Sequence, residues 1–148
     1  MNHQTIDVLL ADDDKDDQFL FEKALKEIPM KTRLEKVNDG TELMHFLDKQ
    51  LNSFPHILFL DLNLPKKNGL LCLEEIRKNE SWNDISVAIY SSSSLESHVE
   101  EAFVLGANIY IKKPDSLTCL QKSLEKILTI NWQYLTSGMN RDNFLLNL

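Results

Sequence analysis

Short apolar runs alternate with longer amphipathic stretches along most of the chain, and this alternation constrains the fold more than any other feature. The runs cover residues 6–11, 33–37, 56–60, 85–90 and 108–112. Each has the length of a β-strand and ends at polar or turn-forming residues. The segment from Ile57 to Leu60 contains no polar residue, which is typical of a parallel strand that helices cover on both faces.

The stretches between these runs carry apolar residues at helical spacing. They predict helices over 14–28, 41–51, 95–105 and 116–132, and a further helix after Gly69 that carries Leu70, Leu73 and Ile76. Asp14 is the predicted cap of the first helix. Five β-α units in strict alternation predict an α/β fold: a flavodoxin-like, doubly wound sheet of five parallel strands in the order 2-1-3-4-5.

The length of 148 residues favours a single domain. We expect this domain to cover residues 1–132. Residues 133–148 fit none of the five units and form a C-terminal extension. Its Phe144-Leu145-Leu146 cluster is either a packing segment or an oligomer contact, and the sequence leaves both readings open.

The composition excludes several classes of partner and environment. Lys plus Arg is 16 and Asp plus Glu is 23, which gives a net charge of −7 and disfavours nucleic acid and anionic membranes. The apolar runs are shorter than a membrane-spanning helix requires. Cys72 and Cys119 share no metal-ligand spacing, and no signal peptide opens the chain. We therefore expect a cytoplasmic protein with reduced thiols.

Polar residues follow the predicted strands at the points where they end. Asp12 and Asp13 follow the first strand, Asp61 the third, Ser91 the fourth and Lys113 the fifth. The carboxyl ends of parallel strands face one crevice, so these side chains should meet there. Converging carboxylates repel one another unless a cation lies between them, and oxygen ligands favour Mg²⁺. A lysine and a hydroxyl opposite them complete a pocket suited to a phosphoryl group.

Four motifs in order carry a resemblance to a known family. They are Leu9-Leu10-Ala11-Asp12-Asp13, Leu60-Asp61-Leu62-Asn63-Leu64-Pro65 with Gly69, Tyr90-Ser91-Ser92, and the segment from Gly106 to Pro114. With these motifs the chain resembles a response regulator receiver domain of two-component signalling, over roughly residues 5–130. It looks like a stand-alone regulator of the chemotaxis type, with some likeness to regulators paired with phytochrome-type or hybrid kinases.

The resemblance implies a role for each residue of the crevice. Asp61 would be the phosphoacceptor, Ser91 the switch hydroxyl, Lys113 the phosphoryl-binding lysine and Tyr110 the aromatic switch. The metal ligands would be Asp12, Asp13, Asp61 and the backbone carbonyl of Asn63, with Mg²⁺ as the cofactor. The peptide bond between Lys113 and Pro114 would be cis, as proline permits.

The implied function is phosphorelay signalling rather than enzymatic turnover. A sensor histidine kinase or a phosphotransfer protein would phosphorylate Asp61, and the surface of the fourth helix, fifth strand and fifth helix would then switch and control a downstream protein. The residues after the receiver region are too few for an output domain. A homodimer through the same surface or through the C-terminal extension is a further expectation. Kinase, stimulus, target and phosphate lifetime stay open.

Two other functions compete with this interpretation. One is a receiver-like binding module that is never phosphorylated, although nothing physical would then retain the clustered acids. The other is a Mg²⁺-dependent aspartyl-phosphate phosphatase, which needs a second acid two residues after the nucleophile; Asn63 stands there and cannot supply a proton. Two further acids near the start of the first helix, Asp16 and Asp17, are interpreted as residues that favour a helix start.

Overall fold

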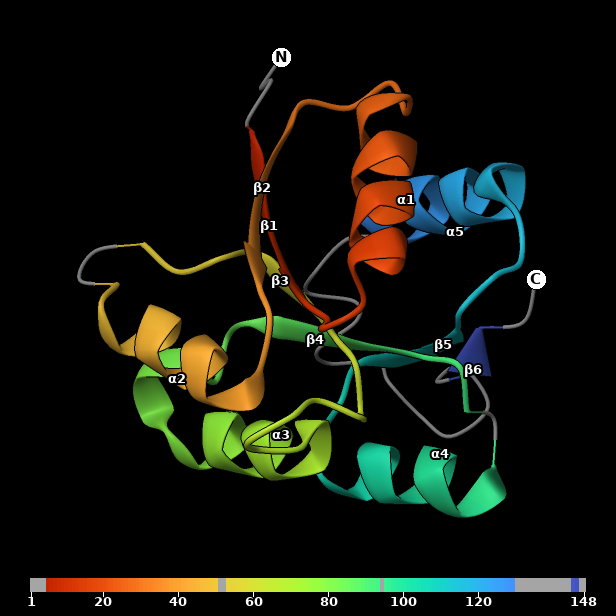
Figure 1. The fold of residues 1–148 in the computed structure, drawn as a ribbon. Coiled ribbons are helices and arrows are strands. Elements are labelled where there is room, and N and C mark those ends of the chain that lie inside the picture. The colour runs from red at the N-terminus through yellow and green to blue at the C-terminus, as the bar shows by residue number, and fades with distance from the viewer. Residues whose placement is uncertain (1–4, 51–52, 94, 130–144, 147–148) are drawn as a thin grey trace.

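The computed structural model describes residues 5–50, 53–93, 95–129 and 145–146. Strands and helices alternate along these residues (Figure 1). The strands are β1 (Ile6–Ala11), β2 (Thr32–Val37), β3 (Ile57–Leu60), β4 (Ser86–Ser91), β5 (Ile109–Lys112) and β6 (Leu145–Leu146). The helices are α1 (Lys15–Lys26), α2 (Gly40–Asp48), α3 (Gly69–Lys78), α4 (Glu96–Val104) and α5 (Leu117–Thr129), with a 3-10 turn η1 (Glu80–Trp82) after α3.

The strands form one parallel sheet in the order β2-β1-β3-β4-β5-β6. The predicted order 2-1-3-4-5 and the flavodoxin-like α/β class are confirmed. β6 is an addition that the sequence did not predict as a strand: Leu145 and Leu146 lie beside Tyr110 and Ile111 of β5. This part of the C-terminal extension therefore lies at the sheet edge, while 130–144 and 147–148 lie outside the described residues. The extension as an oligomer contact stays a prediction.

Helices cover both faces of the sheet (Figure 1). α1 and α5 lie on one face, where Val8, Leu10 and Phe59 pack with helical residues such as Phe21 and Leu124. α2, α3 and α4 lie on the other, where residues from alternate strand positions, Leu9 and Leu58 among them, are buried. Successive residues of a strand point to opposite faces, so an inner strand is apolar at consecutive positions wherever helices cover both faces, as in Ile57–Leu60. This explains the unbroken apolar runs in the sequence.

Helix starts follow side-chain caps. Asp14, Asp39 and Asn68 each accept a hydrogen bond from the backbone N–H three residues later, at the starts of α1, α2 and α3, which satisfies an amide that the helix leaves free. The predicted cap at Asp14 is thus confirmed. The second helix ends at Asp48 rather than at residue 51, and in the described residues the fifth ends at Thr129.

Two expectations about the whole chain concern the thiols and the membrane. Both cysteines are free: Cys72 is buried and Cys119 is exposed. Burial raises the pKa of the Cys72 thiol to about 11, so Cys72 is a protonated core residue. No helix in the described part of the chain is both long and apolar enough to span a membrane.

Candidate functional site

The carboxyl ends of β1, β3 and β5 bring three of the predicted residues into contact. Lys113, directly after β5, has its Nζ 2.9 Å from Asp12 Oδ2 and 2.9 Å from Asp61 Oδ2. The side chain of Asp12 is fully buried, and those of Asp61 and Lys113 are 8% and 12% exposed. The neighbouring Lys112 is exposed. Strand alternation thus selects Lys113 as the lysine that points into the crevice.

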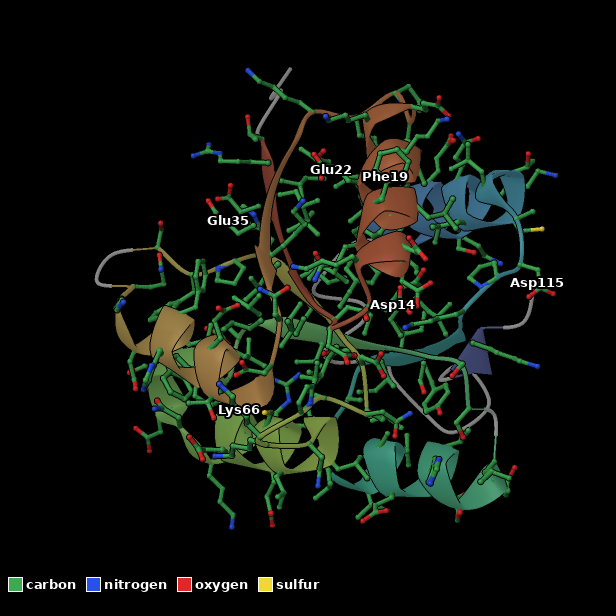
Figure 2. All side chains as sticks on the ribbon, in the orientation of Figure 1. Asp14, Phe19, Glu22, Glu35, Lys66 and Asp115 are labelled. Carbon is green, nitrogen blue, oxygen red and sulfur yellow. The ribbon has the colours of Figure 1, made fainter. Side chains whose placement is uncertain are left out.

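A fourth charged residue belongs to this cluster, and the sequence interpretation missed it. Asp17 Oδ2 accepts a hydrogen bond from Lys113 Nζ at 2.8 Å. Asp17 lies in the first turn of α1, which begins just after the capping residue Asp14 (Figure 2). A negatively charged residue in the first turn of a helix is already explained by its favourable interaction with the positive end of the helix dipole. Helical spacing distinguishes Asp17 from Asp16, because Asp17 lies four residues before the buried Phe21 on the face of α1 that packs on the sheet, whereas Asp16 is exposed. That the lysine reaches this face follows only from the packing of α1 beside the end of β5.

The shared lysine and the burial act in opposite directions on the site's pKa values. Burial raises the pKa of Asp12, whereas the backbone N–H of Asp14 and the nearby Lys113 lower it to a smaller extent. Burial lowers the pKa of Lys113, but its hydrogen bonds to Asp17 and Asp61 and its close contact with Asp12 outweigh this and raise the pKa. Lys113 is therefore protonated at neutral pH. The negative charge of Asp12 costs free energy because the carboxylate is buried.

Three of the acids fit a divalent cation. Oxygens of Asp12, Asp13 and Asp61 lie within 4.8 Å of one another, and Asp13 is exposed. Asp12 Oδ2 is buried and, among the described residues, has no partner with hydrogen-bond geometry despite its closeness to Lys113. A buried oxygen of this kind is suited to a metal or a metal-bound water. The set holds only hard oxygen donors, as a divalent cation of this class requires.

The loop after β3 is tied to the site by its backbone. Asn63 N–H donates to Asp61 Oδ1 at 3.0 Å, while its side chain is exposed. Gly69 N–H donates to the carbonyl of Leu62, and a Cβ at Gly69 would lie 2.3 Å from the Asp61 carbonyl oxygen. Only glycine permits this close approach of α3 to the acid. The Asp61 carboxylate is therefore held by Lys113 on one oxygen and by the loop on the other.

Ser91 and Tyr110 are linked through Ser93. Ser91 is fully buried at the end of β4, and its Oγ accepts from the Ser93 N–H at 3.1 Å. The buried Tyr110 donates its hydroxyl to the Ser93 carbonyl at 2.7 Å. Ser93 Oγ lies 2.7 Å from His98 Nδ1 of α4. The two predicted switch residues thus contact the same backbone segment, and Tyr110 points inward.

One implied feature is wrong in this structure. The described peptide bonds are all trans, including the bond between Lys113 and Pro114, although the resemblance implied a cis bond. Lys113 nevertheless reaches its carboxylates. The trans form is the intrinsically preferred isomer of such a bond.

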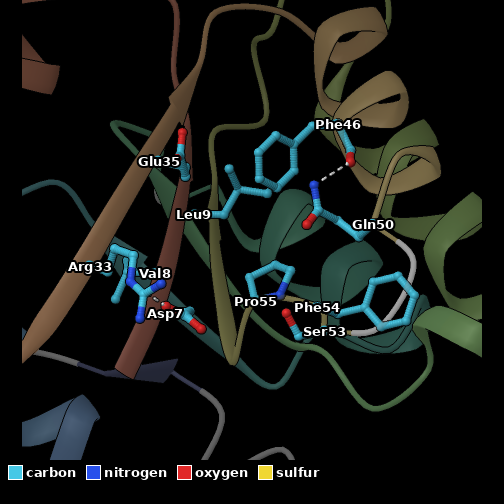
Figure 3. A pocket seen from close by; sticks show the side chains of 10 residues that line it. All are labelled: Asp7, Val8, Leu9, Arg33, Glu35, Phe46, Gln50, Ser53, Phe54 and Pro55. Atoms are coloured by element: carbon cyan, nitrogen blue, oxygen red, sulfur yellow. Dashed lines mark hydrogen bonds and ion pairs between the residues drawn. The ribbon is translucent and has the colours of Figure 1, made fainter. Parts of the chain in front are cut away.

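A cavity of about 200 Å³ lies at the opposite ends of the strands (Figure 3). Leu9, Phe46 and Phe54 give it apolar walls, and Arg33 faces Asp7 across its rim. Arg33 Nε lies 3.2 Å from Asp7 Oδ1, and the side chains of Arg33 and Asp7 are 68% and 33% exposed. None of the predicted site residues lines this cavity.

Comparison with known proteins agrees with this fold and site. The family model described as the response regulator receiver domain matches residues 8–125. The response regulator Rcp1 of Synechocystis is 34% identical over 124 residues, covering 81% of this chain and 84% of the relative. The chain therefore belongs to the response regulator receiver domain family. It is a phosphoacceptor signalling domain of a two-component phosphorelay, with an acidic pocket of Asp12, Asp13 and Asp61 beside Lys113.

Two solved structures of response regulators are similar to this chain. The Mn²⁺-bound form of Rcp1 has a TM-score of 0.75 and 30% identity, covering 91% of this chain and 97% of that one. The phosphorylated cyanobacterial phytochrome response regulator RcpA has a TM-score of 0.77 and 29% identity, covering 93% and 98%. A divalent cation at the acid triad and a histidine kinase as partner follow from this membership.

Proposed function

We propose that Asp61 accepts a phosphoryl group from a phosphohistidine of a sensor histidine kinase or of a phosphotransfer protein. One observation carries the proposal: Asp61 Oδ2 lies 2.9 Å from the ammonium of Lys113, while its carboxylate also belongs to the acid triad with Asp12 and Asp13. Asp61 thus lies beside a cationic donor and also belongs to a group of acids that could hold a metal ion. The other two acids of the triad differ from Asp61, because Asp12 is fully buried and Asp13 is not among the contacts of Lys113.

In the proposed transfer a carboxylate oxygen of Asp61 attacks the phosphorus atom in line. The P–O bond forms as the P–N bond to the histidine breaks, and the imidazole leaves with the electron pair and takes up a proton. Asp12, Asp13, Asp61 and the Asn63 carbonyl would hold Mg²⁺, which would supply the charge neutralisation that two approaching anions need. The Lys113 ammonium pairs with a phosphoryl oxygen, and the Ser91 hydroxyl donates a hydrogen bond to another.

The contacts of Ser93 support a route from the phosphoryl group to the surface. When Ser91 Oγ turns toward the phosphoryl group, it leaves the N–H of Ser93 that it now accepts from. The segment that Ser93 belongs to also holds the Tyr110 hydroxyl and, through His98, contacts α4. Loss of the Ser91 contact therefore biases Tyr110 and α4 together. We propose that the surface of α4, β5 and α5 exists in two arrangements that a downstream protein distinguishes.

Several finer assignments belong to the same proposal. The free thiols of Cys72 and Cys119 support a cytoplasmic location for the reaction. A homodimer through the α4-β5-α5 surface or the C-terminal extension is a further mode of output, and the likeness to phytochrome response regulators favours a phytochrome-type or hybrid kinase as donor. Residues 1–132 form the receiver domain in this scheme and 133–148 its extension.

Intact mass after incubation with acetyl phosphate tests the proposal. We expect a single phosphoryl adduct on the wild type with Mg²⁺, no adduct with EDTA, and no adduct on Asp61→Asn. Asp7→Asn is the matched control, because it removes a carboxylate from the other end of β1 and should label like the wild type. Labelling of Asp61→Asn at the wild-type level would contradict the assignment. Absence of an adduct on the folded wild type, also with a phosphorylated histidine phosphotransfer protein, would favour a binding module that is never phosphorylated.

A further inference from the structure

Asp17 joins α1 to the lysine of the site, across 96 positions of sequence. The Lys113 ammonium has three protons to donate and three carboxylates around it. It donates to Asp17 at 2.8 Å and to Asp61 at 2.9 Å, and Asp12 Oδ2 lies 2.9 Å away. The Asp17 side chain is 35% exposed, whereas those of the other two acids are almost fully buried. Asp17 is therefore the most solvent-exposed of the three carboxylates around Lys113.

Asp17 differs from the other acids in its relation to the metal. The oxygens within reach of one cation belong to Asp12, Asp13 and Asp61, and Asp17 is not among them. Two of these three metal ligands are also partners of Lys113. A divalent cation and the ammonium therefore compete for Asp12 and Asp61, and they repel each other at this short range. When the cation binds, Asp17 is the carboxylate that the lysine does not have to share.

We propose that Asp17 is a positioning residue for Lys113. It keeps the ammonium at the site while a divalent cation occupies Asp12 and Asp61, and so leaves the lysine in place for the phosphoryl group. This inference rests on the proposed phosphoacceptor function. It assigns to Asp17 a role that the helix start does not require, because Asp14 already caps α1 and Asp16 supplies the same charge in the same turn.

The neighbouring Asp16 provides the control for charge alone. Asp16→Asn and Asp17→Asn remove the same charge from the same helical turn, but only Asp17 contacts Lys113. We expect Asp17→Asn to weaken Mg²⁺ binding, measured by titration calorimetry on the whole chain, about three- to tenfold more than Asp16→Asn does. Without Asp17 the ammonium stays with Asp12 and Asp61, and the cation has to displace it. Asp17→Glu keeps a carboxylate within reach and should restore the wild-type dissociation constant to within about twofold.

A double-mutant cycle tests whether the effect passes through the lysine. In a Lys113→Met background, Asp17→Asn should change the Mg²⁺ dissociation constant no more than Asp16→Asn does. With Lys113 present and Mg²⁺ saturating, Asp17→Asn should also slow formation of the acetyl phosphate adduct about threefold or more, because the ammonium is less often in place.

The outcomes separate this inference from the proposed function. A wild type that takes up no adduct, from acetyl phosphate or from a phosphorylated phosphotransfer protein, contradicts the phosphoacceptor assignment whatever Asp17 does. A wild type that is phosphorylated, with Asp17→Asn and Asp16→Asn equal in metal affinity, contradicts the inference alone. An equal effect of Asp17→Asn with and without Lys113, or an Asp17→Glu variant as weak as Asp17→Asn, would also overturn it.

Discussion

The two ends of β1 each carry an aspartate paired with a cation, and the two pairs are built very differently. Asp7, near the start of the strand, faces Arg33 across the rim of a small cavity, and both side chains are in contact with solvent. Asp12, just after the end, is fully buried beside Lys113, which two more carboxylates also contact. Arg33 is mostly in solvent, although Asp7 Oδ1 itself is shielded from it, and we expect this partly exposed pair to contribute little to stability. The second has lost its water and depends on neighbouring charges.

This difference in burial between the two pairs indicates which end of β1 is suited to bind ligands. A crowded, desolvated cluster of one ammonium and three carboxylates is costly for folding unless each charge is compensated, and a bound cation or phosphoryl group changes that compensation directly. The exposed pair has no such sensitivity. We therefore expect the stability of the fold to depend on bound ligands at the Asp12 end of β1 and not at the Asp7 end.

Replacing the basic residue of each pair by methionine should give the largest difference in stability between the two ends of β1. Lys113→Met leaves three acids facing one another, two of them buried, and should lower the free energy of unfolding by about 2–4 kcal/mol in EDTA at neutral pH. Arg33→Met is the matched control and should cost less than about 1 kcal/mol. Urea unfolding followed by circular dichroism measures both. Equal losses for the two variants would show that burial does not distinguish the pairs.

Ligand stabilisation gives the next largest difference. Mg²⁺ at ten times its dissociation constant should raise the free energy of unfolding by about 1.4 kcal/mol, because only the folded chain assembles the triad. Asp13→Asn should remove most of this gain with little effect on the metal-free stability, since Asp13 is exposed. Asp7→Asn should retain the gain in full. A gain that survives in Asp13→Asn would place the cation elsewhere.

The burial of Asp12 predicts a stabilising substitution. Its pKa is raised above 3.8, chiefly by burial, so its charge lowers the stability of the metal-free fold at neutral pH. Asp12→Asn should raise the free energy of unfolding by about 1 kcal/mol in EDTA at pH 7. The folded carboxyl binds its proton at a higher pH than the unfolded one. The advantage should therefore shrink as pH falls through the folded-state pKa and vanish below the unfolded value.

Urea unfolding at a series of pH values measures this advantage. An Asp12→Asn variant that is less stable than the wild type at pH 7 would mean that the pairing with Lys113 outweighs desolvation. An advantage that grows toward low pH would contradict the direction of the pKa shift.

Sequence alone predicted the parts of this site that depend on local pattern. An acid that directly follows an apolar run marks the end of a buried strand. Asp12 and Asp61 could therefore be placed together at the carboxyl ends of neighbouring strands once the strand order was inferred. The position of Lys113 directly after the fifth apolar run likewise placed it beside these acids. The roles of Ser91 and Tyr110 came from the family resemblance, and the structure adds that both side chains contact the backbone of Ser93.

What could not be predicted depends on packing between distant segments. The contact of Asp17 with Lys113 joins residues 96 positions apart and requires the angle at which α1 lies on the sheet, for which the sequence has no local signal. The pairing of Leu145 and Leu146 with β5 is equally non-local. A strand of two residues has no periodicity to detect.

The smallest expected effect is at the exposed pair, and it sharpens the comparison because it has to be close to zero. Asp7→Asn should change the free energy of unfolding by less than about 0.5 kcal/mol, since Arg33 stays solvated without its partner. Whatever difference remains should fall further in high salt, which screens exposed charges. Urea unfolding of the variant and the wild type at low and high sodium chloride measures this. Asp7 Oδ1 is itself shielded from water, so a salt-independent loss of more than about 1 kcal/mol would show that the Asp7 end of β1 is a buried pair like the other.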